Sequence, residues 1–330
     1  MKIRVCSWLK YPRFLVAPDF GMLKSMIMRA KMISALFLSA FLFFNGQTIY
    51  AGFFDWFEVG KNRQANISGM ALIGQTGGQT SFVIVHDNKK KKQARAALLT
   101  IADDKSPQFA ALDWTGGDIP VDLEAITKIP DAPAGYMAIT SGGKVYQLEL
   151  DGAKKSLKVV KSFNLPSIPQ NGNFEGFSLQ RAGSSYFAVW AERGEDARPA
   201  TLFWSVFDLP TGAFSKVDSV AVKVPYPKTN VRHISDVKVD TEGKVFISSA
   251  ADPGNDGPFN SAVYRIGAFD FSKSTAIAFK AETAANQLFT VENRKIEAFE
   301  LLPEAIGGMV YGTDDENLGS AIYFSKPNKK

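Results

Sequence analysis

Five segments of the chain carry a serine or a glutamate at a recurring position, just before an apolar stretch. These residues are Ser68, Glu124, Glu175, Ser235 and Glu297. In each segment an apolar residue comes before this position, and apolar residues alternate with others after it, as a strand requires. The positions lie 56, 51, 60 and 62 residues apart. That period is typical of four-stranded propeller blades with long loops.

A second residue recurs at the end of the next apolar stretch of each repeat. Ser141, Glu192, Asp252 and Asp314 each lie 17 positions beyond the first marker, and Asp87 lies 19 positions beyond Ser68. This spacing predicts a hairpin of nearly constant length in every repeat. Because its strands are antiparallel, we expect the start of the first and the end of the second to meet on one face.

The repeats therefore predict an acidic rim at one mouth of a central channel. The candidate metal ligands are Asp87, Glu124, Glu175, Glu192, Asp236, Asp252, Glu297 and Asp314. Crowded carboxylates raise one another's pKa unless a cation compensates, and ligands that are all oxygen suit Ca²⁺. We expect a calcium site at this rim. In the alternative, each acid caps backbone amides of its own blade and no metal binds.

Three further polar residues beside the markers are candidates for catalysis. His86, His233 and Arg193 would lie near the acidic mouth, where histidine can act as a general acid and arginine can bind an anion. In the alternative they are solvated loop residues. The chain has no GxSxG, HExxH or phosphate-binding glycine motif. The run Lys89–Lys92 is interpreted as a solvated loop.

The elements that position these residues predict an all-β fold, a five-bladed β-propeller. Short apolar stretches separated by glycine and proline dominate the chain, and only Ala281–Gln287 shows a weak helical period. The fifth repeat ends early, after Ala321–Ser325. We expect the separate stretch Phe53–Val59 to complete this blade and close the ring, since an open edge strand would otherwise remain.

The N-terminal segment has the features of a secretory signal. Arg29 and Lys31 precede the apolar run Ile33–Phe44, and Ala51 offers a small residue for cleavage. We expect residues 1–51 to be a signal peptide, with residues 1–27 an over-extended start, and residues 52–330 to be a single propeller domain that is periplasmic or secreted. The alternative is an uncleaved anchor, which the short apolar run disfavours.

Removal of that segment changes the charge balance. Residues 1–51 hold seven basic residues and one acidic residue, so the totals fall from 38 and 33 to 31 and 32. A nucleic-acid partner is therefore not expected, because phosphate binding needs a basic surface. The single cysteine, Cys6, is also removed, which excludes a disulfide or a cysteine nucleophile. We expect a monomer without a membrane span.

At its markers the chain resembles the SdiA-regulated family of exported five-bladed propellers. The order Ser68–Gly69, Glu124–Ala125, Glu175–Gly176, Ser235–Asp236 and Glu297–Ala298 is similar to the family's blade starts. It departs at Ala125, Asp236 and Ala298, where the family has glycine. More distantly, Asn173–Gly176 and Thr313–Asp315 are similar to esterase-like and phytase-like propellers, a resemblance that implies calcium and phosphoester hydrolysis.

These observations leave three functions open. The first is a non-enzymatic propeller whose acidic mouth binds a divalent cation, expected to be calcium, and through it a small-molecule ligand or a protein partner. The second is a calcium-dependent hydrolase of phosphoesters or esters that uses His86 or His233 as the acid. The third is a protein-interaction scaffold without metal, acting through outer loops such as Arg193–Pro199 and Pro253–Asn260.

Overall fold

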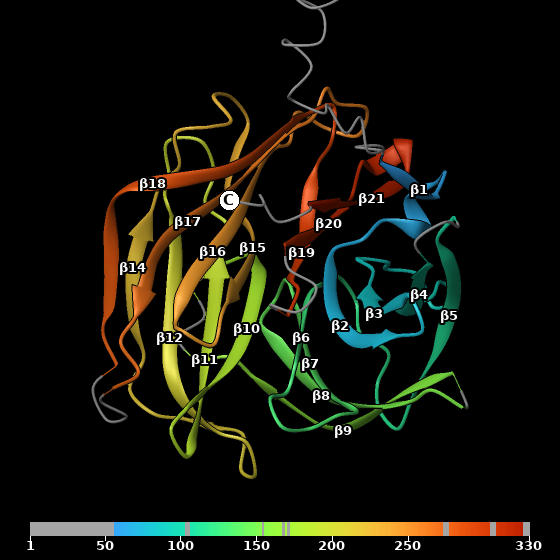
Figure 1. Ribbon diagram of the computed structural model, residues 1–330, viewed down its shortest axis with the longest axis horizontal. Coiled ribbons are helices and arrows are strands. Elements are labelled where there is room, and N and C mark those ends of the chain that lie inside the picture. The colour runs from blue at the N-terminus through green and yellow to red at the C-terminus, as the bar shows by residue number, and fades with distance from the viewer. Residues whose placement is uncertain are drawn as a thin grey trace, which may run out of the picture. The chain divides into compact units, whose positions relative to one another are not determined.

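The computed structural model describes residues 56–102, 106–153, 155–166, 169, 172–272, 277–303 and 308–325. These residues form a ring of five antiparallel β-blades (Figure 1), which confirms the predicted all-β propeller. The predicted signal peptide, residues 1–51, lies outside the described residues. In the described part of the chain no helix has the length and apolar character needed to cross a membrane.

The five blades follow one another along the chain in the predicted order. Blade 1 contains β2 (Gly69–Thr76), β3 (Gln79–Val85), β4 (Ala96–Ala102) and β5 (Gln108–Thr115). Blade 2 contains β6 (Leu123–Lys128), β7 (Gly135–Thr140), β8 (Lys144–Asp151) and β9 (Ser156–Asn164). Blade 3 contains β10 (Phe174–Ala182), β11 (Ser185–Glu192), β12 (Ala200–Asp208), β13 (Ala213–Phe214) and β14 (Asp218–Val222).

The last two blades complete the ring. Blade 4 contains β15 (Val231–Val239), β16 (Lys244–Ala251), β17 (Asn260–Phe269) and β18 (Phe279–Glu292). Blade 5 contains β19 (Ile296–Leu301), β20 (Met309–Thr313), β21 (Ser320–Ser325) and β1 (Phe57–Gly60). Two short 3₁₀ turns, η1 (Arg63–Ala65) and η2 (Glu316–Leu318), flank this blade. The weak helical period at 281–287 is therefore overridden, because these residues belong to β18.

The closing strand is contributed by the N-terminal part of the propeller, as the sequence predicted. β1 pairs antiparallel with β21 and places Phe57 opposite Ile322. Figure 1 shows this blue strand beside the red C-terminal strands. The described strand begins at Phe57, while residues 53–55 of the predicted strand lie outside the described residues. Closure covers the edge of β21 and makes the ring continuous.

The first strand of every blade lies innermost and contacts the first strands of both neighbours, in the cycle β2, β6, β10, β15, β19 and back to β2. These strands are buried on both faces, as in β6, where every residue from Leu123 to Thr127 is buried. The larger hydrophobic side chains pack between adjacent blades, for example Phe187 of blade 3 against Phe269 of blade 4. Blades 1 and 2 are also joined at their outer edges, where β5 pairs parallel with β9.

Two glycines allow the innermost strands to approach closely. A Cβ on Gly69 would lie 2.8 Å from Cα of Ala125 on the next blade. A Cβ on Gly176 would lie 2.7 Å from the backbone N of Val237. Each contact therefore needs a glycine on only one of its two strands. This explains why the fold accommodates Ala125 and Asp236 at positions where glycine was expected from the family resemblance.

We predict that Gly176→Ala destabilises the propeller by about 1–3 kcal/mol, because the added methyl group overlaps the backbone of β15. Gly74→Ala is the matched control, since a Cβ there meets no atom within 4 Å. Urea unfolding of both variants measures the difference. Equal stability of the two variants would contradict the close approach of β10 and β15.

Candidate functional site

A β-bulge at the start of the innermost strand places a glutamate at the channel mouth in three blades. The strand pairing shifts around Glu124 between Leu123 and Ala125, around Glu175 between Phe174 and Gly176, and around Glu297 between Ile296 and Ala298. A bulge inserts one unpaired residue into the ladder and re-aims its side chain. The recurring glutamates of the sequence are thus the bulged residues of β6, β10 and β19.

The three glutamates are similarly buried, but only two of them have a charged partner in the described part of the chain. Their exposed fractions are 8%, 7% and 8%. Glu175 accepts a hydrogen bond of 3.1 Å from Nη1 of Arg193, and Glu297 lies 2.9 Å from the ammonium of Lys295. Glu124 has neither a hydrogen bond nor an ion pair within the described residues. Its oxygens are not among the fully buried unpaired atoms, so water reaches them.

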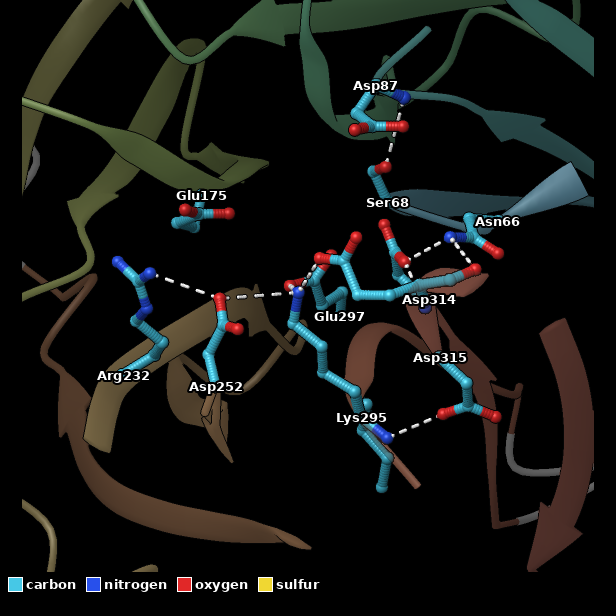
Figure 2. A network of polar contacts seen from close by, with 12 residues as sticks. Asn66, Ser68, Asp87, Glu175, Arg232, Asp252, Lys295, Glu297, Asp314 and Asp315 are labelled. Carbon is cyan, nitrogen blue, oxygen red and sulfur yellow. Dashed lines mark hydrogen bonds and ion pairs between the residues drawn. The ribbon is translucent and has the colours of Figure 1, made fainter. Parts of the chain in front are cut away.

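The buried ammonium of Lys295 is the central cation of the mouth (Figure 2). Besides Glu297, Nζ lies 2.7 Å from Oε1 of Glu316 and 3.5 Å from Oδ2 of Asp252. Burial alone would lower the pKa of Lys295, but the charges of Glu297, Asp314 and Asp252 together raise it well above its usual range. The lysine therefore stays charged and offsets the acids around it.

The glutamates bind protons more tightly than free carboxyl groups do. Burial, followed by the charge of Glu297, raises the pKa of Glu175 to about 8, although Arg193 opposes the shift. Burial and the neighbouring Glu175 raise the pKa of Glu124 well above its usual range. Burial also raises the pKa of Glu297, and the adjacent Lys295 opposes this shift. Of the three, Glu175 therefore holds a proton at neutral pH.

Three acids from the ends of second strands join this group, as the spacing predicted. Asp314 accepts hydrogen bonds from the Asn66 side chain and the Glu316 backbone, and burial raises its pKa well above the usual range. Asp252 lies 3.1 Å from Nη2 of Arg232. Burial also raises the pKa of Asp87, whose backbone N–H donates to Oγ of Ser68 (Figure 2).

Two predicted rim acids have structural partners elsewhere. Glu192 is 3% exposed, lies 2.7 Å from Nη1 of Arg198 and accepts the backbone N–H of Gly194, so it stabilises the loop after β11. Asp236 is fully buried and accepts the backbone N–H groups of Val237 and Phe299, which ties blade 4 to blade 5. Burial raises the pKa of Asp236 to about 7.

Neither histidine has the contacts of a catalytic acid. Nδ1 of His86 lies 2.6 Å from the carbonyl oxygen of Asn66, its Nε2 is buried without a partner, and burial lowers its pKa to about 4. Nε2 of His233 donates to the carbonyl of Asp196 while Nδ1 accepts the N–H of Val224. Both rings are structural. Of the three predicted catalytic candidates, only Arg193 contacts a mouth carboxylate.

Lys295 is the residue that the sequence reasoning missed. It lies two positions before Glu297, and strand alternation places residues i and i+2 on one face. That spacing could have indicated its position. Its charge partners could not be found this way, because Asp252 belongs to the neighbouring blade and Glu316 to η2 after β20.

The prediction of a calcium site at the channel mouth has to be corrected. In the described part of the chain, no group of three or more His, Cys, Asp or Glu side chains is arranged to hold a metal ion. The physical reason is that Lys295 and Arg193 already hold Glu297 and Glu175, while Glu192 and Asp236 are bonded elsewhere. The prediction of a calcium-binding rim is therefore wrong.

Comparison with known proteins gives similarity at the level of fold. No family model and no curated protein matches the chain. An exo-1,5-α-L-arabinanase from a bovine ruminal metagenomic library is 10% identical, with 83% of this chain and 95% of that chain covered and a TM-score of 0.49. A GH43 endo-arabinanase from Bacillus licheniformis is 10% identical, with coverages of 82% and 96% and a TM-score of 0.44.

A third solved structure of similar fold is an exo-β-1,3-galactanase from Phanerochaete chrysosporium. It is 10% identical, with 82% of this chain and 62% of that chain covered, and its TM-score is 0.47. At such identities the likeness describes the fold and assigns no activity to this chain.

The comparisons also correct the family and function predicted from the sequence. The structures of similar fold are glycoside hydrolases, so the resemblance to the SdiA-regulated and phytase-like propellers is wrong. The predicted functions are corrected as well. Calcium-mediated ligand binding and calcium-dependent phosphoester hydrolysis have no metal site in the described part of the chain, and the structures of similar fold named above are glycoside hydrolases and not metal-free scaffolds. Short marker pairs such as Glu175–Gly176 reflect the β-bulge and the close approach of neighbouring innermost strands. Different propellers can share these two backbone features.

The raised pKa of Glu175 predicts how stability depends on pH. An acid with a raised folded pKa contributes stability that is fully present below its unfolded value, 4.5, and lost as pH rises through the folded value of about 8. We therefore expect the free energy of unfolding to fall across this window, by up to about 1.4 kcal/mol per pH unit from this group. Urea unfolding of wild type and Glu175→Gln measures the contribution, and the variant should show a flatter profile. The same pH dependence in wild type and Glu175→Gln would contradict the raised pKa of Glu175.

Removal of the Lys295 ammonium is expected to lower the free energy of unfolding. Lys295→Met leaves Glu297, Asp252 and Glu316 without their shared ammonium, and we expect a loss of about 3–5 kcal/mol in the free energy of unfolding. Lys216→Met breaks an exposed ion pair with Asp218 and should cost at most about 1 kcal/mol. Comparable losses in the two variants would show that Lys295 does not organise the mouth.

Proposed function

We propose that the channel mouth is the catalytic site of a hydrolase that cleaves glycosidic bonds by carboxyl acid–base chemistry. The observation that carries the proposal is the convergence of Glu124, Glu175 and Glu297 from three blades, each about nine-tenths buried. Glu175 is paired with Arg193, Glu297 is paired with Lys295, and Glu124 has no partner in the described part of the chain. Glycoside hydrolysis typically needs one protonated carboxyl group and one carboxylate on opposite sides of the scissile bond. It needs no serine or cysteine nucleophile.

The electrostatics of the mouth support a division into these two roles. Glu175 is protonated at neutral pH, because its pKa is raised to about 8, and it is the general acid that protonates the leaving oxygen. Glu297 is the carboxylate, since it contacts the ammonium of Lys295 at 2.9 Å. Burial raises the pKa of both groups, but the ammonium of Lys295 favours the charged form of Glu297. This difference in partners favours separate acid and base roles.

The remaining groups of the mouth support this chemistry. Glu124, which has no partner and is reached by water, can bond a sugar hydroxyl. Neither His86 nor His233 forms a hydrogen bond with a serine hydroxyl, since each ring is bonded to backbone groups. A serine–histidine pair of the kind used for ester hydrolysis is thus not formed by either ring. Carboxyl-based cleavage of an acetal is the chemistry that these side chains favour.

The test is activity on a panel of aryl glycosides and polysaccharides, including arabinan and β-1,3-galactan, with reducing sugar as the readout. We expect Glu175→Gln to lower kcat by about 10²–10⁴-fold, the usual contribution of a general acid. Glu297→Gln should be at least as damaging, because it removes the charged partner.

Glu149→Gln is the matched control, since Glu149 is an exposed glutamate of β8 outside the mouth. It should retain wild-type activity. Hydrolysis that survives Glu175→Gln and Glu297→Gln, or a wild type inactive on the whole panel, would refute the proposal.

A further inference from the structure

The lysine run Lys89–Lys92 borders the acidic mouth on the side of blades 1 and 2. It follows β3, whose end carries Asp87, and Nζ of Lys89 lies 2.9 Å from Oδ1 of Asp122. Asp122 precedes the bulged Glu124 by two residues and accepts a hydrogen bond of 2.6 Å from Oγ of Ser141. Lys89 therefore lies at the same rim as the three glutamates, and the loop that carries the other three lysines begins there.

A buried arginine fixes the backbone of this loop. Arg95 is 3% exposed, and its guanidinium donates to the carbonyl oxygens of Lys90, Gln93 and Pro120 at 3.0, 2.7 and 2.5 Å. The backbone N–H of Lys90 also donates to Oε1 of Gln93 at 2.8 Å. A fixed backbone lowers the entropy lost when the lysine side chains bind a ligand.

The three lysines beyond Lys89 have no internal charge partner. Lys90, Lys91 and Lys92 are exposed, and none forms an ion pair within the described residues. Three adjacent ammonium groups on a fixed turn repel one another and produce a local positive potential. This potential contrasts with the near balance of 31 basic and 32 acidic residues after position 51.

A second observation points to a ligand at the same end of the ring. Glu124 is 8% exposed and has no hydrogen-bond or ion-pair partner in the described part of the chain, and its charge influences the pKa of Lys89. Buried polar groups are nearly always bonded. A ligand that bonds Glu124 and extends outward over blade 1 would therefore reach the lysines.

We propose that the substrate is an acidic polysaccharide, a polymer of uronic acid, whose carboxylates bind Lys90, Lys91 and Lys92 while the scissile bond lies at the mouth. This inference rests on the proposed glycosidase function and names its substrate class. A polymer explains why the cations lie beside the glutamates and not among them. The charged groups of neighbouring sugars contact the loop, and the bond at Glu175 and Glu297 is an uncharged acetal.

Binding can be measured independently of hydrolysis. The probes are polygalacturonate and fully methyl-esterified polygalacturonate, which share a backbone and differ in charge, and the readout is affinity electrophoresis. We expect wild type to bind the charged polymer at least tenfold more tightly than the ester, with an affinity that falls as salt concentration rises. The triple variant Lys90→Ala, Lys91→Ala, Lys92→Ala should lose that preference.

The matched control removes three exposed lysines from other strands and loops, in the triple variant Lys158→Ala, Lys223→Ala, Lys280→Ala. It should bind like wild type. Equal binding of the two polymers, a preference that survives in the loop variant, or an equal loss in both triple variants would overturn the inference. Failure of the glycosidase function is seen separately, as absence of hydrolysis with charged-polymer binding intact.

Discussion

One buried ammonium sets the charge state of the channel mouth. Lys295 contacts Glu297, Glu316 and Asp252, which come from two blades and from the turn after β20. Without it these acids would have to bind protons or move apart, because isolated charges are not stable in a buried site. The lysine favours the charged form of Glu297, while burial raises the pKa of Glu175 to about 8, and a difference of this kind is what acid–base chemistry needs.

The position of the glutamates follows from a backbone feature and not from the metal that their residue types first indicated. A bulge at the start of β6, β10 and β19 takes one residue out of the ladder and directs it to the mouth. The same position carries serine in blades 1 and 4. The residue type at this position therefore differs between blades, glutamate in three and serine in two, while the antiparallel blade architecture stays the same.

Much of the fold could be predicted from the sequence, because the repeat period and the strand-to-strand spacing are local properties. The five blades, the hairpin offset and closure by an N-terminal strand all followed from residue spacing. Membership of the mouth was only partly predictable. Glu192 has the same spacing as Asp252, and Asp236 directly follows the marker Ser235, yet Arg198 and the backbone of Phe299 hold these two acids away from the group.

The sequence by itself determined the five-bladed ring and the gathering of one marker residue per blade at a common mouth, since alternation and period act along the chain. The tertiary structure alone decided which acids share a cation, which remain unpartnered and which hold a proton. These properties depend on burial and on distances between groups that are far apart in the chain, such as Asp252 and Lys295. For the same reason the acidic residues could be located from the sequence, but their chemistry could not.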